Sequence, residues 1–313
     1  MTLVAPPPPA PPAPPSPPTP PRPTRSARHN RPAAQSTRVQ VIRFVLLSLA
    51  VLTTWSVFYA LVLSPLQAHH SQGVLYSKFR QEVSEETAPI GGAIDAGAPV
   101  AVLDMPAAGL RREVVVEGTA SGDLMKGPGH LRDSVLPGQA GLSVLLGRAD
   151  LFGGPFGSIA SVPLGTTIKI TTGLGIAKYV VSAVDHANAP SPPALASGAG
   201  RLLLVTADSS GWRSGWAPSS SVFVYAELKS KPFGSDGGTP SSVPKAELPM
   251  KGDPSALYEL VLWLPLLLGS SIAVLWAVER WGQWQAWLIG TPVLLATLWG
   301  VSQSAIQLLP NLT

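Results

Sequence analysis

Three long segments without a charged side chain constrain the fold of this chain more than any other feature. They cover residues 44–66, 260–278 and 286–309. An α-helix needs about 20 predominantly apolar residues to cross a hydrocarbon core of about 30 Å, and each segment is about that long or longer. Only 13% of the residues of the chain are charged, partly because these three segments contain no charged residue. We therefore predict three transmembrane helices, over residues 39–66, 256–278 and 286–309.

The charges around the first segment predict its orientation. Residues 1–43 contain six arginines and no acidic residue. Positive flanks stay in the cytoplasm, so we predict a cytoplasmic N-terminus, extracytoplasmic residues 67–255 and a cytoplasmic turn at Glu279 and Arg280. The sequence thus predicts a multi-pass plasma-membrane protein.

The N-terminal tail, residues 1–38, is rich in proline and cannot bury a core, so we expect it to be disordered. A spacer is the simpler interpretation, and docking of a partner on the proline run stays open. The basic tail has no interleaved aromatic residues, which argues against binding of nucleic acid.

Short apolar runs between the first two predicted helices are typical of β-strands. They cover Pro99–Met105, 113–117, 142–148, 166–172, 177–184, 201–206 and Ser221–Leu228. Glycines punctuate them, which favours an all-β barrel or sandwich of seven or eight strands over residues 99–228.

Two segments flank this predicted β domain. Residues 67–98 are expected to hold a juxtamembrane helix, with Val74, Leu75, Phe79 and Val83 on one face, and then a linker. Residues 229–255 are rich in Ser, Gly, Pro and Lys, which predicts a second linker that lets the domain stand off the membrane.

Four blocks of sequence, within about residues 72–228, carry a resemblance to a known family. The first two blocks lie at residues 72–80 and 99–106. The third is Val-Val-Glu-Gly at residues 115–118. The fourth, within residues 127–139, begins with Gly-Pro-Gly-His and ends with Leu-Pro-Gly-Gln. In this order they resemble sortases, the membrane-anchored transpeptidases of Gram-positive bacteria, and among them the actinobacterial class E-like members. The resemblance implies a sortase-like β-barrel at the cell envelope.

Sortases use a Cys nucleophile, a His that exchanges protons and an Arg that stabilises the oxyanion. At the positions that resemble these three, this sequence has Ala207, Arg148 and Ser221. Alanine offers no nucleophile, and the chain contains no cysteine at all. The resemblance therefore implies a catalytically degenerate sortase, not an enzyme, and it gives no reason to expect a cofactor.

An active enzyme with a relocated nucleophile is the alternative. It would need Ser209, Ser210 or Ser214 to pair with His130 or His186, and no nucleophile elbow of the form Gly-x-Ser-x-Gly is present. We interpret His130 as a turn residue with a satisfied ring, and His186 as surface polar.

The old active site could instead bind a ligand. Candidate groove residues are Arg148, His130, Thr206 and Asp208. Arg148 would favour a peptide with a carboxylate, or would simply be solvated at a strand end. A metal site is not expected, because His69 and His70 are adjacent and their rings generally face apart.

A scaffold, binding or assembly role at the bacterial cell envelope follows from these expectations. The C-terminal hairpin places more helix in the lipid bilayer than an anchor requires. Its small residues, Gly269, Ser270, Ser271 and Gly290, suit close approach to another membrane protein or among the three spans themselves. Other membrane or envelope proteins are the expected partners.

Overall fold

The computed structural model describes residues 37–186, 194–208, 220–234 and 242–312. Most of the predicted tail lies outside this part, as do Ser209, Ser210 and Ser214. The chain divides into two compact units, Met1–Ala50 and Val51–Thr313. All contacts given below lie within the second unit.

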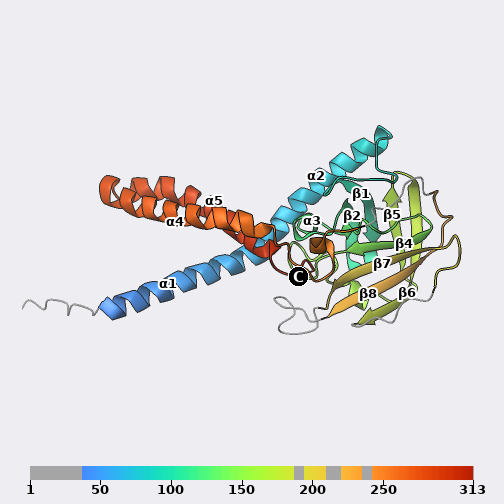
Figure 1. Cartoon of the computed structure of the whole chain (residues 1–313), viewed down its shortest axis with the longest axis horizontal. Coiled ribbons are helices and arrows are strands. Elements are labelled where there is room, and N and C mark those ends of the chain that lie inside the picture. Colours follow the sequence, from blue (N-terminus) through green and yellow to red (C-terminus); the bar gives the residue numbers. More distant parts are fainter. Residues whose placement is uncertain (1–36, 187–193, 209–219, 235–241, 313) are drawn as a thin grey trace, which may run out of the picture. The chain divides into compact units, whose positions relative to one another are not determined.

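Eight strands of the described part close into a barrel, in the order β1, β2, β3, β4, β7, β8, β6, β5 (Figure 1). They are β1 (Pro99–Met105), β2 (Leu110–Glu117), β3 (Gly129–His130), β4 (Gly141–Leu146), β5 (Thr167–Thr172), β6 (Gly175–His186), β7 (Gly200–Ala207) and β8 (Ser221–Leu228). The all-β prediction is confirmed. Two residues are too few to show a periodic pattern, so β3 was not foreseen.

The two faces of the barrel wall bury different residues. Along β7, Leu202 and Leu204 join the main core cluster, whereas Val205 and Ala207 join a second cluster. Because successive side chains of a strand point to opposite faces, this second cluster lies on the outer face of the wall. We call it the outer-face cluster. Its buried members are Leu124, Val144, Leu146, Ala149, Val205, Ala207 and Leu312.

The first predicted membrane helix does not end near residue 66. Helix α1 (Thr37–Phe58) continues through a π-helical turn (Tyr59–Leu63) into α2 (Ser64–Ser84). Pro65 stands in the first turn of α2 and has no N–H to donate to the preceding turn. A π-turn at this point lets the helix accommodate the proline without breaking.

Helix α2 packs on the barrel through a narrower stripe than predicted. Leu75 and Phe79 are buried against Val114 and Val116 of β2. Val74 and Val83 are exposed. Residues four apart lie on the same face of a helix, and in α2 only Leu75 and Phe79 on that face reach the sheet.

The C-terminal hairpin consists of α4 (Ala256–Trp281) and α5 (Gln283–Gln307), which lie side by side in Figure 1. Gly282 alone separates them and has a positive φ of 98°, which an L side chain rarely adopts. Within the described residues, three helices are long and apolar enough to cross a membrane: the one that contains Val45–Ser84, and α4 and α5.

The described parts of residues 229–255 do not form the free spacer that we expected. The Phe233 N–H donates to the Gly138 carbonyl at 2.8 Å, and its ring packs against the main core. Further on, a short 3-10 helix (Lys245–Glu247) buries Glu247 against the barrel. The backbone carbonyl of Glu247 accepts a hydrogen bond from Thr119 Oγ1 at 2.6 Å. The Glu247 carboxylate also pairs with Arg132 at 3.2 Å, so an apolar ring and a buried carboxylate hold this segment on the domain.

Candidate functional site

Strand pairing brings together, at one end of β4, β7 and β8, the three positions that the sequence comparison singled out. Leu146 of β4 pairs with Val205 of β7, and Ala207 pairs with Ser221 of β8. The Gly147 N–H donates to the Val205 carbonyl at 3.0 Å, which continues the pairing toward Arg148. Short apolar strands in this register therefore place Arg148, Ala207 and Ser221 in one neighbourhood.

Ala207 is covered, with only 2% of its surface exposed. Its methyl group belongs to the outer-face cluster, together with Leu146, Val205 and Leu312. Ser221, its partner across the ladder, is partly exposed. Ala207, the position expected from the resemblance to match the nucleophile, thus makes an apolar contact.

Arg148 is fully buried, so it is neither solvated nor exposed in a groove. Its Nη2 donates to the Ser121 carbonyl at 3.1 Å and to Ser121 Oγ at 2.7 Å, at the start of α3 (Ser121–Leu124). The guanidinium carbon lies 5.2 Å from the centre of the Phe152 ring, a cation–π contact. Burial lowers the Arg148 pKa to about 9, and the charge of Tyr59 acts in the opposite direction.

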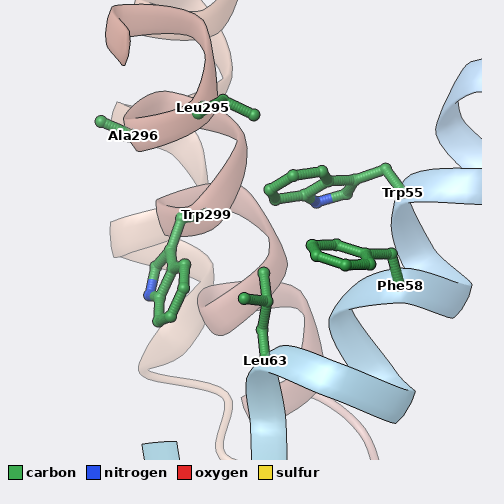
Figure 2. Close-up of a pocket in the computed structure, with 6 residues that line it drawn as sticks. All are labelled: Trp55, Phe58, Leu63, Leu295, Ala296 and Trp299. Atoms are coloured by element: carbon green, nitrogen blue, oxygen red, sulfur yellow. The ribbon is translucent and has the colours of Figure 1, made fainter. Parts of the chain in front are cut away.

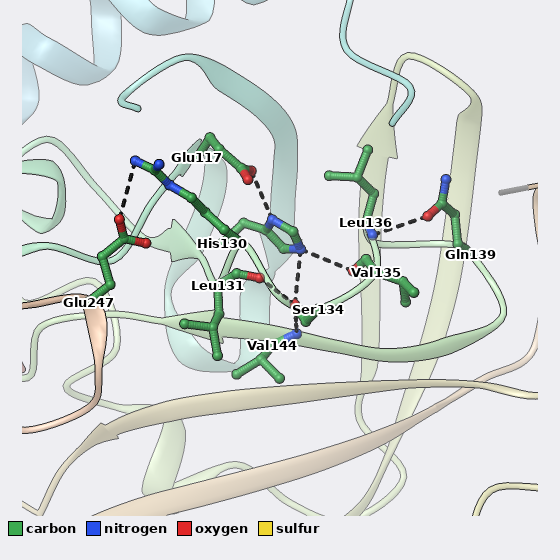
Figure 3. A network of polar contacts seen from close by, with 10 residues as sticks. Glu117, His130, Leu131, Ser134, Val135, Leu136, Gln139, Val144 and Glu247 are labelled. Carbon is green, nitrogen blue, oxygen red and sulfur yellow. Dashed lines mark hydrogen bonds and ion pairs between the residues drawn. The ribbon is translucent and has the colours of Figure 1, made fainter. Parts of the chain in front are cut away.

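His130 lies in β3 and not in a free turn, and its ring is bonded on both sides (Figure 3). Nδ1 lies 2.8 Å from Glu117 Oε2, and Nε2 lies 3.0 Å from the Val135 carbonyl and 3.1 Å from Ser134 Oγ. All three side chains are buried. Sequence reasoning missed Glu117 and Ser134 as partners of this ring, because their spacing matches no known motif.

The protons of this network decide what it can do. A carbonyl oxygen only accepts, so the Val135 carbonyl requires a hydrogen on His130 Nε2. Ser134 Oγ donates to the Leu131 carbonyl at 2.7 Å and accepts from the Val144 N–H at 3.0 Å. His130 therefore does not offer Ser134 a free lone pair at Nε2, as a general base must.

The other candidate groove residues differ in exposure. Thr206 is buried, and its hydroxyl donates to the Gly147 carbonyl at 2.9 Å. Asp208 is partly exposed, and its Oδ2 accepts from Ser220 Oγ at 3.2 Å. His186 is half-exposed, as expected of a surface residue, with Nδ1 3.9 Å from the same oxygen. Of the four candidate groove residues, only Asp208 reaches solvent.

No metal site is evident in the described ranges. Among the described residues, no group of three or more His, Cys, Asp or Glu side chains could hold a metal ion. His69 and His70 are both exposed on α2.

A cavity of about 530 Å³ lies between α5 and the end of α1 with the π-helical turn that follows it (Figure 2). Trp55 and Phe58 form one side and Trp299 the other, and Trp55 Nε1 donates to Ser302 Oγ at 2.9 Å. The remaining lining residues are Leu63, Leu295 and Ala296. Such an apolar lining suits a hydrocarbon environment.

The segment after α5 was not foreseen as part of the site. Leu312 is fully buried in the outer-face cluster, and its carbonyl accepts from the Ala149 N–H at 2.9 Å. The five described residues after α5, 308–312, carry no pattern that predicts this placement.

The fold and the site together define a β-barrel domain that has a closed, apolar site on the outer face of β4 and β7, in a chain with three helices long and apolar enough to cross a membrane. Residues 103–228 match the family model described as the sortase domain. This part of the chain is therefore similar to a sortase domain.

Several solved structures are similar to this chain. A sortase D5 transpeptidase from Clostridium perfringens has 20% identity and a TM-score of 0.42, and the match covers 51% of this chain and 99% of that one. Sortase E from Streptomyces avermitilis has 24% identity and a TM-score of 0.38, with coverage of 50% and 100%. Sortase A from Corynebacterium diphtheriae has 18% identity and a TM-score of 0.38, with coverage of 53% and 92%. No curated protein matches the sequence.

Proposed function

We propose that this chain is a non-catalytic sortase-fold protein that acts as a scaffold, binding or assembly subunit at the bacterial cell envelope. One observation carries the proposal: Ala207 stands at the end of β7, inside an apolar cluster, where the resemblance expects the nucleophile. A methyl group cannot attack a carbonyl carbon, and no cysteine elsewhere in the chain can replace it.

Arg148 and Ser221 support the same proposal. The buried Arg148 guanidinium is bonded to Ser121, and its lowered pKa of about 9 still leaves it charged near neutral pH. It therefore cannot serve as a proton acceptor there. Ser221 carries no charge with which to stabilise an oxyanion.

Incubation of the purified full-length protein with sorting-motif peptides and hydroxylamine tests the loss of activity. We expect no hydroxamate above the level of a buffer blank. Turnover that disappears in Ser134→Ala, Ser209→Ala, Ser210→Ala or His130→Ala would contradict the proposal.

The active alternative rests on one specific observation, the buried series Ser134, His130 and Glu117. Its order resembles a hydrolase triad. The Ser134 hydroxyl, however, donates to the Leu131 carbonyl, and the Val135 carbonyl takes the hydrogen of His130 Nε2. We therefore favour a structural role for this series.

The assembly role predicts a stable partner in the membrane. Extraction in mild detergent followed by copurification is the test, and we expect an envelope or membrane protein in stoichiometric amount. A chain that purifies only as a lone monomer, after gentle extraction and crosslinking in cells, would contradict the assembly role.

A further inference from the structure

The C-terminal segment covers the degenerate site. Leu312 is fully buried against the outer-face cluster that contains Leu146, Val205 and Ala207. Its carbonyl accepts the Ala149 N–H, one residue after Arg148. The last described residue of the chain therefore lies where a peptide in the old active site would be expected.

Asn311 fixes this segment on its other side. Its Nδ2 donates to the Thr119 carbonyl at 2.8 Å and to the Leu248 carbonyl at 3.1 Å. Its backbone N–H donates to the Lys251 carbonyl at 2.9 Å. The amide thus bridges the barrel and the segment that precedes α4, and the Asn311 side chain is buried.

These contacts combine two features by which protein surfaces bind a peptide, here with residues 311–312 in a turn and not in an extended strand. Main-chain hydrogen bonds set the position, and a pocket for a side chain gives the specificity. Here the Asn311 side-chain amide donates hydrogen bonds to two backbone carbonyls, and the next residue, Leu312, packs in the apolar outer-face cluster. Residues 310–312 belong to no strand of the barrel, so they can leave without breaking one.

We propose that the outer face of β4 and β7 is a peptide-binding site whose resident ligand is the chain's own C-terminal segment, residues 309–312. The ligand class is a short peptide with an amide side chain followed by a leucine-sized side chain. This inference rests on the proposed binding role and names its ligand chemistry. It also gives the hairpin a purpose, since two crossings return the chain to the side of the membrane on which the barrel lies.

The cysteine-free sequence allows a direct test with the full chain in detergent. Ala207→Cys introduces one thiol under the C-terminal segment, and its rate of maleimide labelling reports how often the site is uncovered. We expect labelling to be at least about tenfold faster when residues 310–313 are deleted, because a buried thiol reacts only in opened molecules. Leu164→Cys, on a side chain that is 66% exposed, is the control and should label equally fast in both backgrounds.

The second arm supplies the ligand from outside. The peptide Leu-Pro-Asn-Leu-Thr, added to the truncated Ala207→Cys protein, is expected to restore slow labelling. The same peptide with alanine for asparagine and aspartate for its second leucine should leave labelling fast. If truncation prevents folding, Leu312→Asp in the intact chain takes its place, with circular dichroism to verify the barrel.

Two outcomes would overturn the inference. One is equal labelling of Ala207→Cys with and without the C-terminal segment in folded protein. The other is fast labelling of the truncated protein in saturating peptide. Neither involves transpeptidation or copurification, so a failure here is distinguishable from a failure of the proposed function.

Discussion

Arg148 is a cation buried in the domain, and its role is structural. The guanidinium donates twice to Ser121 and stacks on Phe152. We expect Arg148→Ala to lower the free energy of unfolding by about 2–4 kcal/mol, because it leaves a cavity and strands the Ser121 acceptors. Thermal unfolding of the detergent-solubilised protein, followed by circular dichroism, measures this loss.

Arg148→Met is the matched control for that prediction. It keeps most of the side-chain volume but also leaves the Ser121 acceptors without their donor, so we expect a loss of about 1–2 kcal/mol, smaller than the loss for Ala. Equal losses for Ala and Met would mean that the charge itself, and not the packing, stabilises the site.

Glu113 makes stability depend on pH. Burial raises its pKa from 4.5 to about 7. Between these values the folded state binds more protons than the unfolded state, so stability is full below pH 4.5 and is lost as the pH rises toward 7. The loss from this residue is at most about 3 kcal/mol.

Glu113→Gln is expected to remove that part of the pH dependence and to stabilise the protein above pH 7. Unfolding curves between pH 5 and pH 8 for both proteins check it. An unchanged slope in the variant would show that Glu113 is charged in the folded protein throughout this range.

At the scale of elements, seven of the eight strands were predictable, whereas the two-residue β3 and the helix joints were not. The predicted bounds of the first and last strands, Pro99–Met105 and Ser221–Leu228, agree with β1 and β8. Apolar β-branched runs between glycines identify such strands locally. The continuation of α1 into α2 was missed, since Pro65 normally signals a helix boundary and a π-turn accommodated it instead.

The glycines of the C-terminal hairpin differ in a way that the sequence could not show. A Cβ on Gly290 would approach Val274 Cγ2 of α4 to 2.5 Å, whereas a Cβ on Gly269 would meet nothing within 4 Å. We expect Gly290→Val to push α4 and α5 apart and to lower the unfolding temperature by several degrees. Gly269→Val should leave the isolated protein unchanged.

These two variants also separate packing within the chain from packing with a partner. If Gly269 faces another membrane protein, Gly269→Val weakens copurification while thermal unfolding of the isolated chain stays as in the wild type. Destabilisation of the isolated chain by Gly269→Val to the same extent as by Gly290→Val would contradict this assignment.

At the scale of the whole molecule, the contacts of the C-terminal segment bear on topology. Asn311 bonds to Thr119, so the end of α5 and the barrel lie on the same side of any membrane that α4 and α5 both cross. Single cysteines in the cysteine-free chain test the orientation with an impermeant maleimide on intact cells. We expect Leu164→Cys and Thr313→Cys to be labelled on intact cells. Ser26→Cys and Gln283→Cys should be labelled only after the cells are lysed.

The sequence by itself determined the three apolar helices, seven of the eight strands and the absence of a thiol, because each depends on local composition or periodicity. Only the tertiary structure decided the surroundings of Ala207. Three sets of contacts join residues far apart in the chain. Arg148 bonds to Ser121, the His130 ring is hydrogen-bonded on both sides, and Leu312 packs in the outer-face cluster. Such contacts depend on strand register and on where a helix hairpin returns, and short sequence patterns carry neither.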